Sequence, residues 1–79
     1  MNDQEVLEKL AGIINEIQGV DVADVTVEKS LVDDLEIDSL AMVEISVAIE
    51  DQLGVNIPDE DLKSIVTVGD AVNYVKSHS

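Results

Sequence analysis

Apolar residues recur at three- and four-residue spacing in three separate stretches of the chain, a pattern that predicts amphipathic α-helices. In the first stretch these residues are Val6, Leu7, Leu10, Ile13, Ile14 and Ile17. They predict a helix from about Asp3 to Gln18. Asn2 with Glu5 three residues later resembles a capping box at its start, and Gly19 is a suitable stop.

The second stretch predicts a helix from about Ser39 to Leu53 that ends at Gly54. Its apolar residues are Leu40, Met42, Val43, Ile45, Val47, Ile49 and Leu53. They are too many for one narrow stripe, so this helix is either buried on most sides or leaves some apolar groups exposed. Glu44 and Asp51 share a face, with Glu50 adjoining, which gives the exposed side an acidic character.

The last third of the chain predicts a short helix and a longer one. Val55–Pro58 is extended because proline restricts the residue before it. A short helix follows over Asp59–Ile65, with acids in its first turn, where the helix dipole favours them. Thr67 with Asp70 resembles another cap, and a final helix ends near His78. Its apolar face consists of Val68, Ala71, Val72 and Val75.

The connection from Gly19 to Asp38 has no regular period, and a loop of that length must be packed by its own side chains. We expect a crossing loop anchored by Val20, Val22, Val25, Val27, Leu31 and Leu35. A short β-strand at 25–27 is an alternative. The chain of 79 residues is too short for two cores, so we expect one domain, 1–79. The predicted fold is all-α: a small four-helix bundle of three main helices and one short helix.

Charge and composition exclude several functions. Eighteen acidic residues against four lysines and no arginine give a net charge of -14, so nucleic acid and anionic membranes are poor partners. The expected partner is a protein with a basic patch. No apolar run is long enough to span a bilayer, and the polar, acidic N-terminus is unlike a signal peptide. We therefore expect a cytoplasmic monomer that does not insert into membranes.

Catalytic and metal-binding patterns are absent from the sequence. The chain has no cysteine, no glycine-rich phosphate loop, and one imidazole, His78, near the end of the last helix. Asp34, Glu36 and Asp38 alternate like the start of a calcium loop, but the required glycine and bidentate glutamate are missing. We therefore expect no catalytic residue and no specific metal site, although weak divalent binding to clustered carboxylates is plausible.

Ser39 remains, placed where a polar loop meets the second predicted helix. By itself Asp38-Ser39-Leu40 is explained as an ordinary helix start. Four stretches in this order and spacing change that interpretation: Leu31-Val32-Asp33-Asp34-Leu35, Asp38-Ser39-Leu40 followed by Val43-Glu44, Ile57-Pro58-Asp59-Glu60, and Thr67-Val68-Gly69-Asp70. With them, nearly the whole chain resembles an acyl carrier protein, of the stand-alone type found in bacterial fatty-acid synthesis.

The resemblance implies that Ser39 carries phosphopantetheine, transferred from coenzyme A by a phosphopantetheinyl transferase. This agrees with the missing cysteine, because the arm brings its own thiol, and with a helix N-terminus, which favours a negative phosphodiester. The chain offers no base to activate the Ser39 hydroxyl, so the transferase must supply activation and magnesium. The resemblance implies a carrier of acyl chains among fatty-acid synthesis enzymes, and not an enzyme.

The resemblance also implies which residues meet other molecules. Asp38 would lie in the surface that the transferase reads, and the surface read by partner enzymes would comprise Leu40, Glu44, Val47, Glu50 and Asp51. Val43 and Ile65 are candidates for the lining of an acyl pocket, with ordinary core packing as the alternative for both.

The chain departs from the commonest fatty-acid pattern in two places. Glu36-Ile37 stands where Gly-Ala is frequent, and Ala41 stands where an acid often follows the motif. The change at Ala41 leaves partner choice open. A carrier for polyketide or other specialised acyl assembly is the nearer alternative function. An acidic adaptor that is never modified is an alternative of another class.

Overall fold

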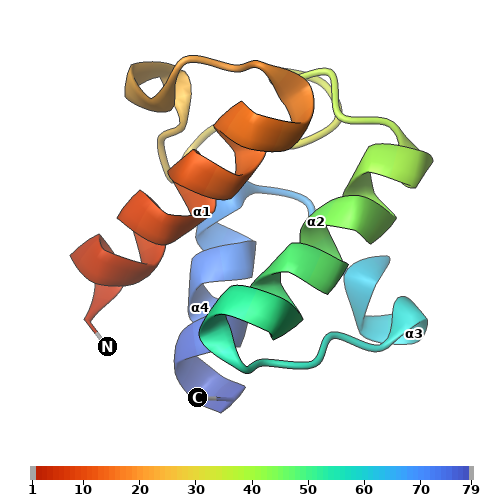
Figure 1. The fold of residues 1–79 in the computed structure, drawn as a ribbon. Coiled ribbons are helices and arrows are strands. Elements are labelled where there is room, and N and C mark those ends of the chain that lie inside the picture. The colour runs from red at the N-terminus through yellow and green to blue at the C-terminus, as the bar shows by residue number, and fades with distance from the viewer. Residues whose placement is uncertain (1, 79) are drawn as a thin grey trace.

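The helices expected from the sequence are present in the computed structural model, which describes residues 2–78. In chain order the elements are α1 (Asp3–Gln18), the 3₁₀ helix η1 (Val22–Asp24), α2 (Ser39–Leu53), α3 (Asp59–Leu62) and α4 (Val68–His78). The three long helices surround one aliphatic core, and short α3 lies beside α2 (Figure 1). The all-α fold of three main helices and one short helix is thereby confirmed for the described residues.

Local hydrogen bonds explain where the first long helix begins and ends. The Asn2 side chain accepts a hydrogen bond from the Glu5 N–H at 2.9 Å, so the predicted cap is present. At the other end, Gly19 has a φ of 74° and its N–H donates to the Asn15 carbonyl at 2.9 Å. This left-handed conformation favours glycine, which has no Cβ to clash.

Helix α3 is shorter than the sequence predicts, because it ends at Leu62 and not at Ile65. After Leu62 the backbone tightens: the Ser64 N–H donates to the Asp61 carbonyl (3.0 Å), and the Ile65 N–H donates to the Leu62 carbonyl (3.2 Å). Such i→i+3 bonds end an α-helix and turn the chain sharply. The turn allows Ile65 to enter the core, where 7% of its surface stays exposed.

The start of α4 has the reciprocal cap that the sequence predicts. The Asp70 N–H donates to the Thr67 hydroxyl, and the Thr67 N–H donates back to the Asp70 carboxylate, both at 3.1 Å. That carboxylate also accepts from the Val66 N–H at 3.1 Å. The backbone hydrogen bonds from Thr67 and then Val66 stabilise the ionised form, and so lower the pKa of Asp70 from its ordinary value of 3.8.

The long connection between α1 and α2 is a packed loop, as predicted, but two of its expected anchors are wrong. Val22 and Val27 are 52% and 48% exposed, because they lie in a surface 3₁₀ turn and a second surface turn. The other four anchors are buried or partly buried and pack in or against the core: Val20, Val25, Leu31 and Leu35. Ile37 is a further anchor, fully buried, that the sequence interpretation did not include.

The alternative of a strand at 25–27 is wrong, since the loop pairs with the start of α4 only through an isolated bridge between Ser30 and Thr67. The flanking backbone hydrogen bonds run from Leu31 N–H to Val66 carbonyl (2.9 Å), from Val68 N–H to Lys29 carbonyl (3.0 Å) and from Gly69 N–H to Val27 carbonyl (3.0 Å). A Cβ at Gly69 would lie 3.1 Å from the Val27 carbonyl oxygen. The close approach explains glycine at this position.

An ion pair joins the first and last helices. Lys76 near the end of α4 forms an ion pair with Asp3 at the start of α1, at 2.5 Å, so these two helix ends lie at the same side of the molecule (Figure 1). Along residues 2–78, no helix combines the length and the apolarity that crossing a membrane requires.

Candidate functional site

Ser39 is the first residue of α2 and its side chain is exposed. The helix is capped by the preceding residue: the Asp38 carboxylate accepts from the Ala41 N–H at 2.8 Å. The Ser39 hydroxyl has no hydrogen-bond partner anywhere in residues 2–78. Asp38 alone therefore accounts for the helix start, and the ordinary capping explanation does not account for Ser39.

The backbone that presents Ser39 is fixed immediately before the helix. Ile37 is fully buried and its N–H donates to the Leu31 carbonyl at 3.0 Å. One residue earlier, the Glu36 carbonyl accepts from the Gln18 side-chain amide at 2.9 Å. Glu36 has a φ of 56°, in the left-handed region that glycine adopts without a steric penalty. These contacts hold the backbone at residues 36 and 37 and so place Ser39 at the surface.

An open groove of about 550 Å³ begins at Ser39 and lies between the start of α2 and α3. Its residues are Val32, Ile37, Asp38, Ser39, Met42, Val43, Asp59, Leu62, Lys63 and Ile65. Both expected pocket residues line it, but in different ways. Val43 is 45% exposed at the groove, so ordinary core packing is the wrong explanation for it. Ile65 is buried and belongs to the core cluster as well.

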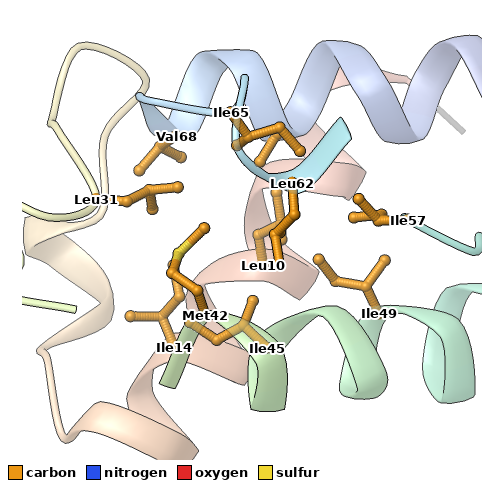
Figure 2. Close-up of a pocket in the computed structure, with 11 residues that line it drawn as sticks. Leu10, Ile14, Leu31, Met42, Ile45, Ile49, Ile57, Leu62, Ile65 and Val68 are labelled. Atoms are coloured by element: carbon orange, nitrogen blue, oxygen red, sulfur yellow. The ribbon is translucent and has the colours of Figure 1, made fainter. Parts of the chain in front are cut away.

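Next to the groove lies a small apolar cavity lined from α1, α2, α3, α4 and the segments between them (Figure 2). Its volume is about 10 Å³, room for about one water molecule. In Figure 2, Leu62 and Ile65 face Met42 and Ile45 across it. Met42, Leu62 and Ile65 line both the groove and the cavity, so these three side chains separate the two spaces.

The expected recognition residues lie along the exposed surface of α2. Leu40 and Val47 are large apolar side chains that are 69% and 63% exposed. Glu44, Glu50 and Asp51 are exposed on the same helix, and the Glu50 carboxylate accepts a hydrogen bond from the Asn56 side chain. Of the two outcomes expected for this helix, the one with exposed apolar groups is correct. The buried side of α2 carries Ala41, Met42, Ile45, Ser46 and Ile49.

Sequence reasoning did not place six of the groove residues at the site: Val32, Ile37, Met42, Asp59, Leu62 and Lys63. Met42 stands three residues after Ser39, and that helical spacing could have placed it below the serine. Leu62 could have been found as the apolar residue of an otherwise acidic short helix. Lys63 is the basic residue at the groove, and no pattern in the sequence distinguishes it from the other lysines.

His78, set aside as a catalytic residue, is exposed at the end of α4. Its ring stacks on Tyr74 with 4.0 Å between ring centroids. Its Nδ1 lies 2.9 Å from the Tyr74 carbonyl oxygen. Ser39 begins α2 and His78 ends α4, so the hydroxyl and the imidazole stand on different helices. The contacts of the His78 ring are with Tyr74.

Comparisons with known proteins agree with this geometry. Residues 8–75 match the family described as "Phosphopantetheine attachment site". The chain is 57% identical over 75 residues to an acyl carrier protein of Thermobifida fusca, covering 95% of each chain. It is 56% identical over 75 residues to the meromycolate extension acyl carrier protein of Mycolicibacterium aurum, covering 95% of this chain and 77% of that one. The structure also resembles the acyl carrier protein of Enterococcus faecalis, with a TM-score of 0.82, 40% identity and full coverage of both chains.

Proposed function

The chain belongs to the acyl carrier protein family, and from this premise we propose that it carries growing fatty acyl chains on a phosphopantetheine arm attached to Ser39. Acyl carrier proteins of this kind are carriers and not enzymes. In this proposal the protein moves the acyl chain between fatty-acid synthesis enzymes. The observation that carries the proposal is an exposed serine, whose hydroxyl has no hydrogen-bond partner within residues 2–78, at one end of a mainly apolar groove.

The residues around Ser39 fit the prosthetic group. In its first turn α2 has backbone N–H groups without intrahelical partners, and this positive end of the helix favours an anionic phosphodiester. The group supplies the thiol that this cysteine-free chain lacks, and so a place to hold an acyl chain as a thioester. The groove beside Ser39 is open enough to take part of the arm.

In the proposed attachment reaction the Ser39 oxygen would bond to the phosphorus of the coenzyme A diphosphate that carries pantetheine. The P–O–P bond would break with adenosine 3′,5′-bisphosphate as the leaving group, and the hydroxyl proton would pass to a base. Asp38 is the neighbouring carboxylate, but its oxygen accepts the Ala41 N–H and holds the helix start. This role makes Asp38 a positioning residue. Activation of the hydroxyl is therefore assigned to the phosphopantetheinyl transferase, which would bind Asp38 and Ser39 as part of its recognition surface.

The groove and the cavity support a path for the acyl chain. Val43 and Ile65 line the groove that begins at Ser39, and Ile65 continues into the core. Both residues are proposed to contact the acyl chain. The cavity of about 10 Å³ is too small for an acyl chain, so a longer chain would enter the core only if its lining side chains moved.

The exposed surface of α2 is proposed as the recognition face for partner enzymes. Leu40 and Val47 offer apolar contact area near Ser39, while Glu44, Glu50 and Asp51 offer negative charge. Partner enzymes with basic patches would complement this surface, because charge complementarity raises association rates and selects among partners.

Substitution of Ser39 tests the proposal directly. Wild-type protein, Ser39→Ala and the control Ser77→Ala would each be incubated with coenzyme A, magnesium and a phosphopantetheinyl transferase. Intact mass spectrometry should show one added phosphopantetheine on the wild type and on Ser77→Ala, and none on Ser39→Ala. Attachment to Ser39→Ala would refute the site, and persistent absence from the wild type would favour the unmodified adaptor.

A specialised acyl cargo is the second candidate function. One relative at 56% identity is named for meromycolate extension, a more specific role than general fatty-acid synthesis. The acyl groups found on protein isolated from its native cell distinguish the two. A range of intermediate chain lengths supports general fatty-acid synthesis, and one restricted class of chain supports the specialised role.

A further inference from the structure

Helix α3 is weakly anchored by its own sequence. It is four residues long, it begins at Pro58 without a side-chain cap, and none of its residues is fully buried. Its backbone hydrogen bonds are local, from the N–H groups of Asp61 and Leu62 to the Pro58 carbonyl at 3.0 and 2.9 Å. Short segments with few buried contacts and local hydrogen bonds open at low free energy.

One side-chain hydrogen bond ties α3 to the longer helix α4. The Tyr74 hydroxyl on α4 donates to the Asp61 carboxylate at 2.7 Å. The Tyr74 ring is itself oriented by stacking on His78, with 4.0 Å between centroids and 10° between planes. The hydrogen bond to Asp61 also raises the pKa of Tyr74 from its ordinary value of 10.0. We call the Tyr74–Asp61 hydrogen bond the α3 latch.

The latch lies next to the boundary between the groove and the cavity. Leu62 directly follows Asp61 and is one of the three side chains that line both spaces. In Figure 2, Leu62 projects from α3 into the cavity, toward the side chains of α2. Movement of α3 away from α2 would therefore withdraw Leu62 and join the groove to the core, and such movement would strain or break the latch.

We propose that the α3 latch opposes entry of the acyl chain into the core, and so sets how readily a chain on Ser39 passes from the groove to the cavity. The inference rests on the proposed function. It applies to chains long enough to pass Leu62, and a two-carbon group serves as the short-chain comparison. Tyr74 and Asp61 act here as positioning residues for Leu62 and need not touch the chain.

The first test uses protein without any arm, and so does not depend on loading. Tyr74→Phe removes the hydroxyl but keeps the stacked ring, and Asp61→Ala removes the acceptor. Glu60→Ala is the matched control, because it also replaces an acid of α3 by alanine but leaves the latch intact. Amide hydrogen exchange at Leu62 and Lys63 should become about two- to tenfold faster in both latch variants and not in the control.

A double variant shows whether the two residues act through one hydrogen bond. Tyr74→Phe combined with Asp61→Ala should exchange no faster than the faster single variant, because the bond can be lost once. Rates that multiply would mean that the two residues stabilise α3 independently, and would overturn the latch. Exchange in Tyr74→Phe equal to that of the wild type would overturn it as well.

The second test uses octanoyl- and acetyl-loaded protein, with loading confirmed by intact mass. If the latch opposes entry, Tyr74→Phe should bury the octanoyl chain more often and slow cleavage of its thioester by hydroxylamine about two- to tenfold. Cleavage of the acetyl thioester should not change. Equal or faster cleavage of the octanoyl group in Tyr74→Phe would overturn the inference, whereas failure to load the wild type would refute the proposed function instead.

Discussion

Replacing Glu36 by glycine should stabilise the fold, because Glu36 holds a left-handed backbone conformation with a φ of 56°. In that conformation the Cβ of an ordinary L-residue crowds the backbone, at a cost of about 1–2 kcal/mol. The substitution should leave its tertiary contact intact, since Gln18 binds the carbonyl oxygen of Glu36 and not its side chain.

Two opposing contributions set how much Glu36→Gly changes the free energy of unfolding. Relief of the left-handed conformation favours the folded glycine variant by about 1–2 kcal/mol. The greater freedom of glycine in the unfolded chain opposes folding by about 0.4–1 kcal/mol. The net stabilisation lies between about 0 and 1.6 kcal/mol, with a central value of about 0.8 kcal/mol, which for a domain of this size is a rise in melting temperature of about 3–6 °C.

The effect of the lost charge on the melting temperature must be measured apart from the effect of the backbone conformation, because Glu36→Gly also removes one acid from a chain with net charge -14. Glu36→Gln is the matched control: it removes the charge but keeps the Cβ. Thermal melting of the three proteins should be followed by circular dichroism over a salt series. The difference between Glu36→Gln and wild type should shrink with salt, while that between Glu36→Gly and Glu36→Gln should persist. If Glu36→Gly melts no higher than Glu36→Gln at high salt, the conformation at Glu36 is not strained.

Asp70→Ala should lower stability at neutral pH. The difference from wild type should begin to shrink as the pH falls to about 4, near the pKa of the unfolded chain, and should be smallest below the lowered pKa of the folded carboxyl, because the stability linked to its ionisation is lost over that interval. Urea unfolding across pH tests this. Glu44→Lys should slow association with a transferase or ketosynthase mainly at low salt, whereas Leu40→Ala should weaken the complex at every ionic strength. If Glu44→Lys associates as fast as wild type at low salt, the exposed surface of α2 is not the recognition face. Wild-type melting temperature should rise with salt or millimolar magnesium, because close like charges repel, and calorimetry showing no rise would mean that the acids are already compensated.

The three long helices could be predicted from the sequence because their signals are local. Periodic apolar residues indicate one face of α1, and the residues that cap it, Asn2 and Gly19, stand at its two ends. The reciprocal cap of Thr67 and Asp70 is equally local, because its partners are three positions apart. Prediction was less accurate for α3, where the helix end depends on Ile65 being drawn into a core built from distant segments.

Ser39 was identified from motifs, but the exposure of its neighbours required the tertiary structure. The apolar residues of α2 alone do not say which are buried, and the fold buries Met42 while leaving Leu40 and Val43 exposed. In the loop before Ser39, too, the sequence alone does not say which apolar residues are buried. Ile37 is a main anchor although it stands in a polar run, because the loop crosses over the core at that residue.

The sequence by itself determined the three long helices, the caps of α1 and α4, the acidic surface and the serine at the start of α2, since each depends on residues close together in the chain or on composition alone. The tertiary structure decided what surrounds that serine. The groove and the small cavity exist because Met42 from α2 meets Leu62 and Ile65 from the α3 region. The hydrogen bond between Tyr74 and Asp61 likewise joins residues 13 positions apart. Such contacts depend on how helices pack against one another, which the spacing of residues within a single helix does not specify.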